Sequence, residues 1–172
     1  MITADQLTAR YSRPLALTLC QELHAPEALA DFCIRYMRHP DPLVARNALC
    51  VLTKAGSRDL LQLQPLTDDL ILLAMTTAHP SVRRLSLSLV ERLPMHAHAV
   101  RPHFLDFCLS HMTDVQEPPG IQSLCMKLAF RMCRHFPPLM CELRCTLEAM
   151  DTTFYLPAVK SIRSRILNGR FR

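Results

Sequence analysis

The stretch that decides the fold is "AHPSVRRLSLSLVERLP", residues 78–94. A proline opens it, a valine and two arginines follow, and apolar residues then recur at steps of three and four up to a second proline. This spacing places the apolar residues on one face of an α-helix. They are Val82, Leu85, Leu89 and Leu93. Because proline fits the first turn of a helix and interrupts a helix interior, the stretch predicts a helix that begins at Pro80.

The same phrase occurs four times along the chain. The other copies are "PLVARNAL" from Pro42, "PGIQSLCM" from Pro119 and "PAVKSIRS" from Pro157. The four prolines are spaced by 38, 39 and 38 residues, and each is followed two positions later by valine or isoleucine. An aspartate also opens "DFCI" at residue 31, "DLIL" at 69 and "DFCL" at 106, with nearly the same period. Agreement between two registers predicts an internal repeat of about 38 residues.

Each repeat is predicted to consist of a first helix, a short turn and a second helix that the proline phrase opens. Most of the 13 prolines fall where one helix should end and the next begin, and Pro14 is expected to start or kink a helix near the N-terminus. Thr67, followed by two aspartates, is predicted to be the N-cap of a first helix. Thr3 and Gln6 resemble a capping box.

The predicted fold class is all-α. A helix pair cannot bury its apolar face alone, so the pairs should stack into a short right-handed α-solenoid of about four to five pairs. With only 3 glycines, a protein built from antiparallel hairpins is not expected. We expect one domain over residues 1–172, with an N-terminal cap at 1–23, repeats at 24–168 and a basic tail at 169–172.

The repeat resembles HEAT repeats and their armadillo-like relatives over roughly residues 24–168. In that family an aspartate often precedes the proline and an arginine follows the valine, and the two form ladders between repeats. Asp41 matches the acidic position, Arg83 and Lys160 match the basic position, and Gln122 matches it weakly. The resemblance implies a scaffold whose second helices line a concave surface that holds a protein segment or, in some branches, nucleic acid.

Basic residues on the predicted second helices are the candidate partner-binding residues. They are Arg46, Arg83, Arg84, Lys127, Arg131, Lys160 and Arg163. Arg46, Arg84 and Lys160 stand close to equivalent repeat positions and are expected to form a row. The predicted function is therefore a non-catalytic interaction or scaffold role, with an acidic or extended segment of a partner protein as the ligand.

Two other readings of the basic residues stay open. One is that duplex nucleic acid binds the basic row and the tail "VKSIRSRILNGRFR", which carries five Lys and Arg without an acid. The other is that these residues are solvated or paired with acids on adjacent helices. Single-stranded nucleic acid is not expected, because aromatic residues that would stack on bases are missing from the second helices.

Catalysis is not predicted. The sequence lacks a Gly-rich phosphate loop, G-x-S-x-G, H-E-x-x-H and C-x-x-C. A base-processing enzyme, the least favoured reading, would need a buried acid in the groove, for which Asp106 and Glu142 on first helices are the candidates. The aromatic-lined site of the DNA-glycosylase branch of these solenoids is not carried over, because the chain has no Trp.

No cofactor or metal is expected. A zinc site needs four tetrahedral ligands, whereas the 8 cysteines are expected to pack between helices as reduced thiols. The His and Cys groups considered were His96, His98 and His103, and then Cys133, His135, Cys141 and Cys145. His39 and His79 should lie in turns. The N-terminus lacks the apolar core of a signal peptide and no window of 18 apolar residues occurs, so we expect a cytoplasmic protein that does not enter a membrane.

Overall fold

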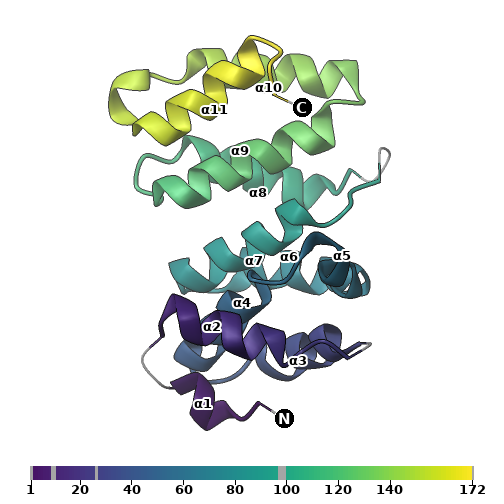
Figure 1. Ribbon diagram of the computed structural model, residues 1–172. Coiled ribbons are helices and arrows are strands. Elements are labelled where there is room, and N and C mark those ends of the chain that lie inside the picture. Colours follow the sequence, from purple (N-terminus) through teal and green to yellow (C-terminus); the bar gives the residue numbers. More distant parts are fainter. Residues whose placement is uncertain (1, 9–10, 26, 97–99, 172) are drawn as a thin grey trace. The chain divides into compact units, whose positions relative to one another are not determined.

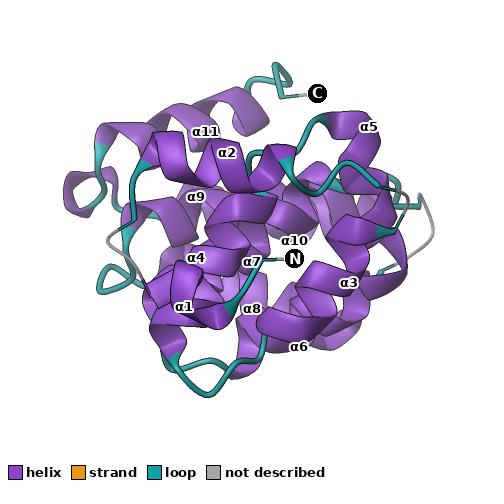
Figure 2. Cartoon of the chain, turned by 60° about the horizontal axis from the view of Figure 1, so that its bottom comes forward, coloured by secondary structure: helices purple, strands orange, loops and turns teal. Residues whose placement is uncertain are grey.

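The computed structural model describes residues 2–8, 11–25, 27–96 and 100–171. These residues form α-helices and short 3₁₀ helices, with no β-strand among them, as Figure 2 shows. The all-α fold class is therefore confirmed. Contacts between Cα atoms divide the chain into two compact units, unit 1 at residues 1–94 and unit 2 at residues 95–172.

Unit 1 contains two helix pairs and a two-helix N-terminal segment. Its elements are α1 (Ala4–Thr8), α2 (Arg13–Gln21), α3 (Ala28–Tyr36), α4 (Pro42–Leu52), α5 (Ser57–Leu60), the 3₁₀ helix η1 (Leu61–Leu66), α6 (Thr67–Thr76) and α7 (Pro80–Arg92). The pairs are α3 with α4 and α6 with α7, and the second helices α4 and α7 pack against each other. Helices α1 and α2 also contact α4 (Figure 1).

Unit 2 repeats the same arrangement. Its elements are α8 (Pro102–Thr113), α9 (Pro119–Cys133), α10 (Pro137–Ala149), the 3₁₀ helix η2 (Thr152–Phe154) and α11 (Pro157–Leu167). Here α8 pairs with α9, α10 pairs with α11, and the second helices α9 and α11 are in contact (Figure 1). All four second helices begin at the predicted prolines, so the repeat register is confirmed within the described residues.

Local signals at the helix ends gave mixed results. The capping box is confirmed, because the Thr3 N–H donates to Gln6 Oε1 at 2.8 Å and the Gln6 N–H to Thr3 Oγ1 at 3.5 Å. Pro14 lies in the first turn of α2, as expected. The prediction for Thr67 is wrong. The Thr67 hydroxyl donates to the Gln64 carbonyl at 2.7 Å, so it does not accept a hydrogen bond from an N–H group of α6. The helix η1 runs directly into α6, and Thr67 is the first residue of α6 rather than the residue before it.

The core of unit 1 is centred on α4. This helix is buried except at Pro42, Leu43 and Arg46, because α1, α2, α3 and α7 contact its other sides. Full burial of a valine or leucine side chain stabilises the folded state by about 1.5–3 kcal/mol. As a result, only the N-terminal turn of α4 carries exposed side chains on this second helix.

The basic side chains Lys160, Arg165 and Arg170 at the end of unit 2 are exposed, but the backbone there follows a defined course. Gly169 adopts a left-handed conformation (φ 65°), and the Arg170 N–H returns to the Arg165 carbonyl at 2.8 Å, which closes α11. The Phe171 ring then packs edge-on against Phe130 of α9, with the centroids 5.1 Å apart, and the Arg165 guanidinium lies over it at 5.2 Å. Residues 169–171 therefore fold back onto unit 2.

We expect residues 1–172 to unfold as one domain, as the single repeat period predicts. Stacked repeats stabilise one another through their interfaces, so the chain should show a single calorimetric transition with equal calorimetric and van't Hoff enthalpies. Two separated transitions, each removing about half of the helical signal, would contradict the single-domain prediction.

Ser86→Ala is expected to leave the free energy of unfolding unchanged or to raise it by up to about 1 kcal/mol. Ser86 is fully buried in α7, and its hydroxyl has no hydrogen-bond partner among the described residues. Removing an unsatisfied buried hydroxyl relieves its desolvation cost, and alanine also favours helix. Urea denaturation measures the change, with Ser88→Ala on the same helix as the control for helix propensity. A loss above 1 kcal/mol would indicate a partner for the hydroxyl.

Candidate functional site

Two of the candidate basic residues, Arg83 and Arg163, donate hydrogen bonds to backbone carbonyls of the same chain. Arg83 on α7 donates from Nε to the Ala74 carbonyl at 3.2 Å and from Nη2 to the Thr77 carbonyl at 2.9 Å. Arg163 on α11 donates from Nε to the Leu147 carbonyl at 2.6 Å. In each case a second-helix arginine satisfies carbonyls at the C-terminal end of the first helix of its own pair.

The basic position of the repeat phrase thus has a structural use. Gln122, at the position equivalent to Arg83, donates from Nε2 to the Asp114 carbonyl at 2.6 Å, just after α8. Lys160 holds this position in the last pair but is exposed, and Arg163 makes the contact one turn later. Asp41 does not belong to a described ladder: its carboxylate accepts the Leu43 N–H at 2.8 Å and so caps α4.

Sequence reasoning missed two further residues of this kind. The buried Asn47 of α4 donates from Nδ2 to the Leu7 carbonyl of α1 at 2.6 Å. Arg92, at the end of α7, donates to the carbonyls of Thr53 and Ala55 at 2.8 and 2.6 Å, just after α4. Arg92 stands outside the proline phrase. Asn47 stands within the first copy, but the other three copies have Leu85, Leu124 and Ile162 at that position, so the shared pattern carried no signal for either residue.

Arg83→Ala is expected to lower the free energy of unfolding by about 1–3 kcal/mol, because it leaves two helix-end carbonyls without these donors. Arg83→Gln should recover part of the loss, since a glutamine makes the equivalent contact at position 122. Arg84→Ala is the matched control, because Arg84 is the next residue and is exposed. Urea denaturation followed by circular dichroism provides the measurement. Equal losses in the Arg83 and Arg84 variants would exclude the capping role.

Arg46 is half-buried on the N-terminal half of α4, and its guanidinium is held in place from two sides. Nη1 donates to Asn47 Oδ1 at 3.0 Å, and the guanidinium lies over the Tyr11 ring, 5.5 Å from its centroid. Burial raises the pKa of the Tyr11 hydroxyl to about 12. The ring therefore stays neutral at physiological pH and presents its face to the cation.

A hollow of about 210 Å³ lies between the N-terminal turns of α4 and α7. We call it the α4–α7 hollow. It is lined by Pro42, Leu43, Arg46, His79, Pro80, Ser81 and Val82. Arg84 is exposed one turn after Pro80 and Ser81, on the same side of α7. Arg46 and Arg84 both stand four residues after the proline of their phrase. The structure thus brings these two predicted residues to adjoining helices of unit 1.

Unit 2 has no equivalent basic pair. Four residues after its two phrase prolines stand Ser123 and Ser161. Lys127 and Arg131 lie further along α9 and are half-buried, whereas Lys160 is exposed in the first turn of α11. Whether Lys160 continues a row from Arg46 and Arg84 depends on the placement of unit 2, so the row stays a prediction.

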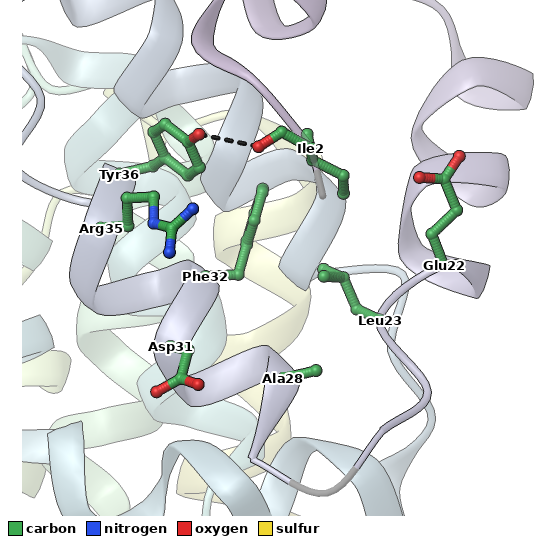
Figure 3. Close-up of a pocket in the computed structure, with 8 residues that line it drawn as sticks. All are labelled: Ile2, Glu22, Leu23, Ala28, Asp31, Phe32, Arg35 and Tyr36. Atoms are coloured by element: carbon green, nitrogen blue, oxygen red, sulfur yellow. Dashed lines mark hydrogen bonds between the residues drawn. The ribbon is translucent and has the colours of Figure 1, made fainter.

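Two other hollows of unit 1 are lined by both apolar and ionisable side chains. Figure 3 shows the first, of about 230 Å³, where the Phe32 ring lies among Ile2, Leu23 and Ala28 and the Tyr36 hydroxyl donates to the Ile2 carbonyl at 2.8 Å. Glu22, Asp31 and Arg35 complete its lining. The second, of about 340 Å³, contains Cys20, His24, Lys54 and Asp59. Burial, followed by the Asp59 charge, raises the pKa of the Cys20 thiol, which makes it a weak nucleophile.

The acids considered from sequence are exposed, and the metal ligands considered from sequence do not form a cluster of three or more in the described part of the chain. Asp106 and Glu142 are both exposed, so neither is the buried acid that a base-processing enzyme requires. No group of three or more His, Cys, Asp or Glu residues in the described part of the chain is arranged to hold a metal ion. His98 lies outside the described residues. His39 and His79 lie in the turns before α4 and α7, as predicted.

No described helix combines the length and the apolar character needed to cross a bilayer. A family model described as a HEAT repeat domain matches residues 3–170. No curated protein and no solved structure matches the chain.

Proposed function

Because the chain belongs to the HEAT repeat family, whose repeats generally mediate protein interactions, we propose that it is a non-catalytic interaction module that binds a segment of a partner protein. The proposed contact surface is the α4–α7 hollow together with Arg84. The observation that carries this proposal is the pair Arg46 and Arg84, which lie on adjoining second helices beside the exposed Leu43. The ligand class is an acidic segment with an apolar side chain.

The chemistry of the hollow supports an acidic ligand. Arg46 is pre-positioned by Tyr11 and Asn47, so less side-chain entropy is lost when it binds a carboxylate. The His79 side chain makes no capping hydrogen bond, and the N–H groups in the first turn of α7 add positive potential at the same place. Leu43 is 41% exposed and offers an apolar contact beside these donors.

The other candidate basic residues have different roles in the proposal. Arg83 and Arg163 act within the chain, because their guanidinium groups cap first helices. Lys127, Arg131 and Lys160 of unit 2 are proposed as secondary contacts of the partner protein. The strongest effect on partner binding is therefore expected from Arg46 and Arg84.

Site-specific photo-crosslinking tests the proposal. A benzophenone amino acid at position 43 should capture a discrete partner protein from native lysate, and Arg46→Glu with Arg84→Glu should abolish this capture. The same amino acid at position 34 of α3, where Ile34 is 57% exposed, is the matched control and should not capture that partner. Capture that is equal at both positions, or that survives the charge reversal, would refute the proposed surface.

Duplex nucleic acid, the alternative ligand, predicts a different result. If Arg46 and Arg84 each contact one phosphate, the logarithm of the binding constant should fall with the logarithm of salt concentration at a slope of about −1.8. Fluorescence anisotropy of a labelled DNA duplex measures this slope. If the wild-type protein binds the duplex at physiological salt and the Arg46→Glu, Arg84→Glu variant does not, the ligand of this surface is nucleic acid rather than a protein segment.

A further inference from the structure

Two of the eight cysteines do not behave as core residues. Cys33, Cys50, Cys108, Cys125 and Cys133 are buried and Cys20 is intermediate, whereas Cys141 and Cys145 are exposed. Free cysteine is among the residue types most often found buried, since it packs as a small apolar side chain. The two exposed thiols of α10 therefore need an explanation other than packing.

The two thiols lie together on the outer face of α10. They are four residues apart and thus one turn apart on the helix, and both are exposed. The residues that α10 buries are Leu143 and Leu147. At about 100° per residue, the direction midway between these leucines is opposite to the direction midway between the cysteines. The thiols consequently point away from the helices that α10 packs against.

Their proximity also affects their ionisation. A thiolate at Cys141 repels one at Cys145, which raises the pKa of the Cys145 thiol, and the charge of Glu148 acts in the same direction. Soft metal and metalloid ions prefer thiolate ligands and displace the thiol protons when they bind.

We propose that Cys141 and Cys145 form a two-thiol site on α10 that binds a thiophilic metal or metalloid ion. Thiolates about 2.3 Å from a tetrahedral ion stand about 3.8 Å apart, a separation that two side chains one helical turn apart can reach by rotation about their side-chain bonds. A disulfide fits less well. It requires Cβ atoms about 3.5–4.5 Å apart, whereas Cβ atoms one turn apart on a helix are separated by about 5–6 Å. The site is independent of the α4–α7 hollow.

Phenylarsine oxide is the probe for this site. Its trivalent arsenic forms two As–S bonds, and the arsenic-bound oxygen leaves with the two thiol protons as one water, so no oxidant is needed. Intact mass should show one phenylarsenic group on each folded chain. An excess of a monothiol should leave the adduct in place, because the chelate holds arsenic at two points, whereas a dithiol should remove it.

Serine variants locate the site. Cys141→Ser with Cys145→Ser should abolish the adduct without changing the circular dichroism spectrum, because both side chains are exposed. Cys20→Ser is the matched control and should react like the wild type. Cys108 and Cys125 are fully buried, so they should react only after unfolding. Undiminished uptake by the folded double variant, or removal of the wild-type adduct by monothiol, would overturn the proposal.

Discussion

Leu89→Asp is expected to unfold unit 1 at room temperature. Leu89 is fully buried in the C-terminal half of α7, which packs against both α4 and α6. An aspartate there places a charge between helices without a partner, at a cost of several kcal/mol in addition to the lost apolar burial. The total is comparable to the free energy of unfolding of a typical domain, about 5–15 kcal/mol. Thermal denaturation followed by circular dichroism measures the effect.

The matched control for this variant is Ser81→Asp on the same helix. Ser81 is exposed in the first turn of α7, where a negative charge interacts favourably with the helix dipole by about 0.3–1 kcal/mol. The control should therefore melt at the wild-type temperature or slightly above it. If Leu89→Asp melted like its control, the repeat register on α7 would be wrong.

Phe104→Ala is expected to lower the free energy of unfolding by about 3–5 kcal/mol. Phe104 is 1% exposed on α8, and α8 packs along α9 over much of its length. Truncation removes the apolar burial of the ring and leaves a cavity that the surrounding helices fill only in part. Urea denaturation gives the change in the midpoint, with the slope of the transition as a check that the mutation acts on the folded state.

Phe154→Ala makes the same substitution at an exposed position of unit 2. The Phe154 side chain is 70% exposed at the end of η2, so its removal should change the free energy of unfolding by no more than about 0.5 kcal/mol. Similar losses in the two variants would show that the described packing of α8 does not carry the stability of unit 2.

The candidate site was only partly visible in the sequence. Arg46 and Arg84 were identifiable because both follow a phrase proline by four residues, and equivalent positions of neighbouring repeats recur on adjoining helices. Their charge alone did not distinguish them from Arg83, which differs from Arg84 by one position along α7. A step of about 100° around the helix directs Arg83 to the end of α6 and leaves Arg84 exposed.

The sequence by itself determined the repeat and its register. Proline at the start of a helix and apolar residues at steps of three and four are constraints within one segment, so they remain readable without a partner helix. At Thr67 the outcome was also local, because the preceding η1 supplies the Gln64 carbonyl to which the hydroxyl donates. Tertiary structure decided the rest: α1, α2 and α3 covered most of α4, and Phe171 folded back onto Phe130. Each of these tertiary outcomes depends on which side chain approaches from another segment, and spacing along the chain does not encode that approach.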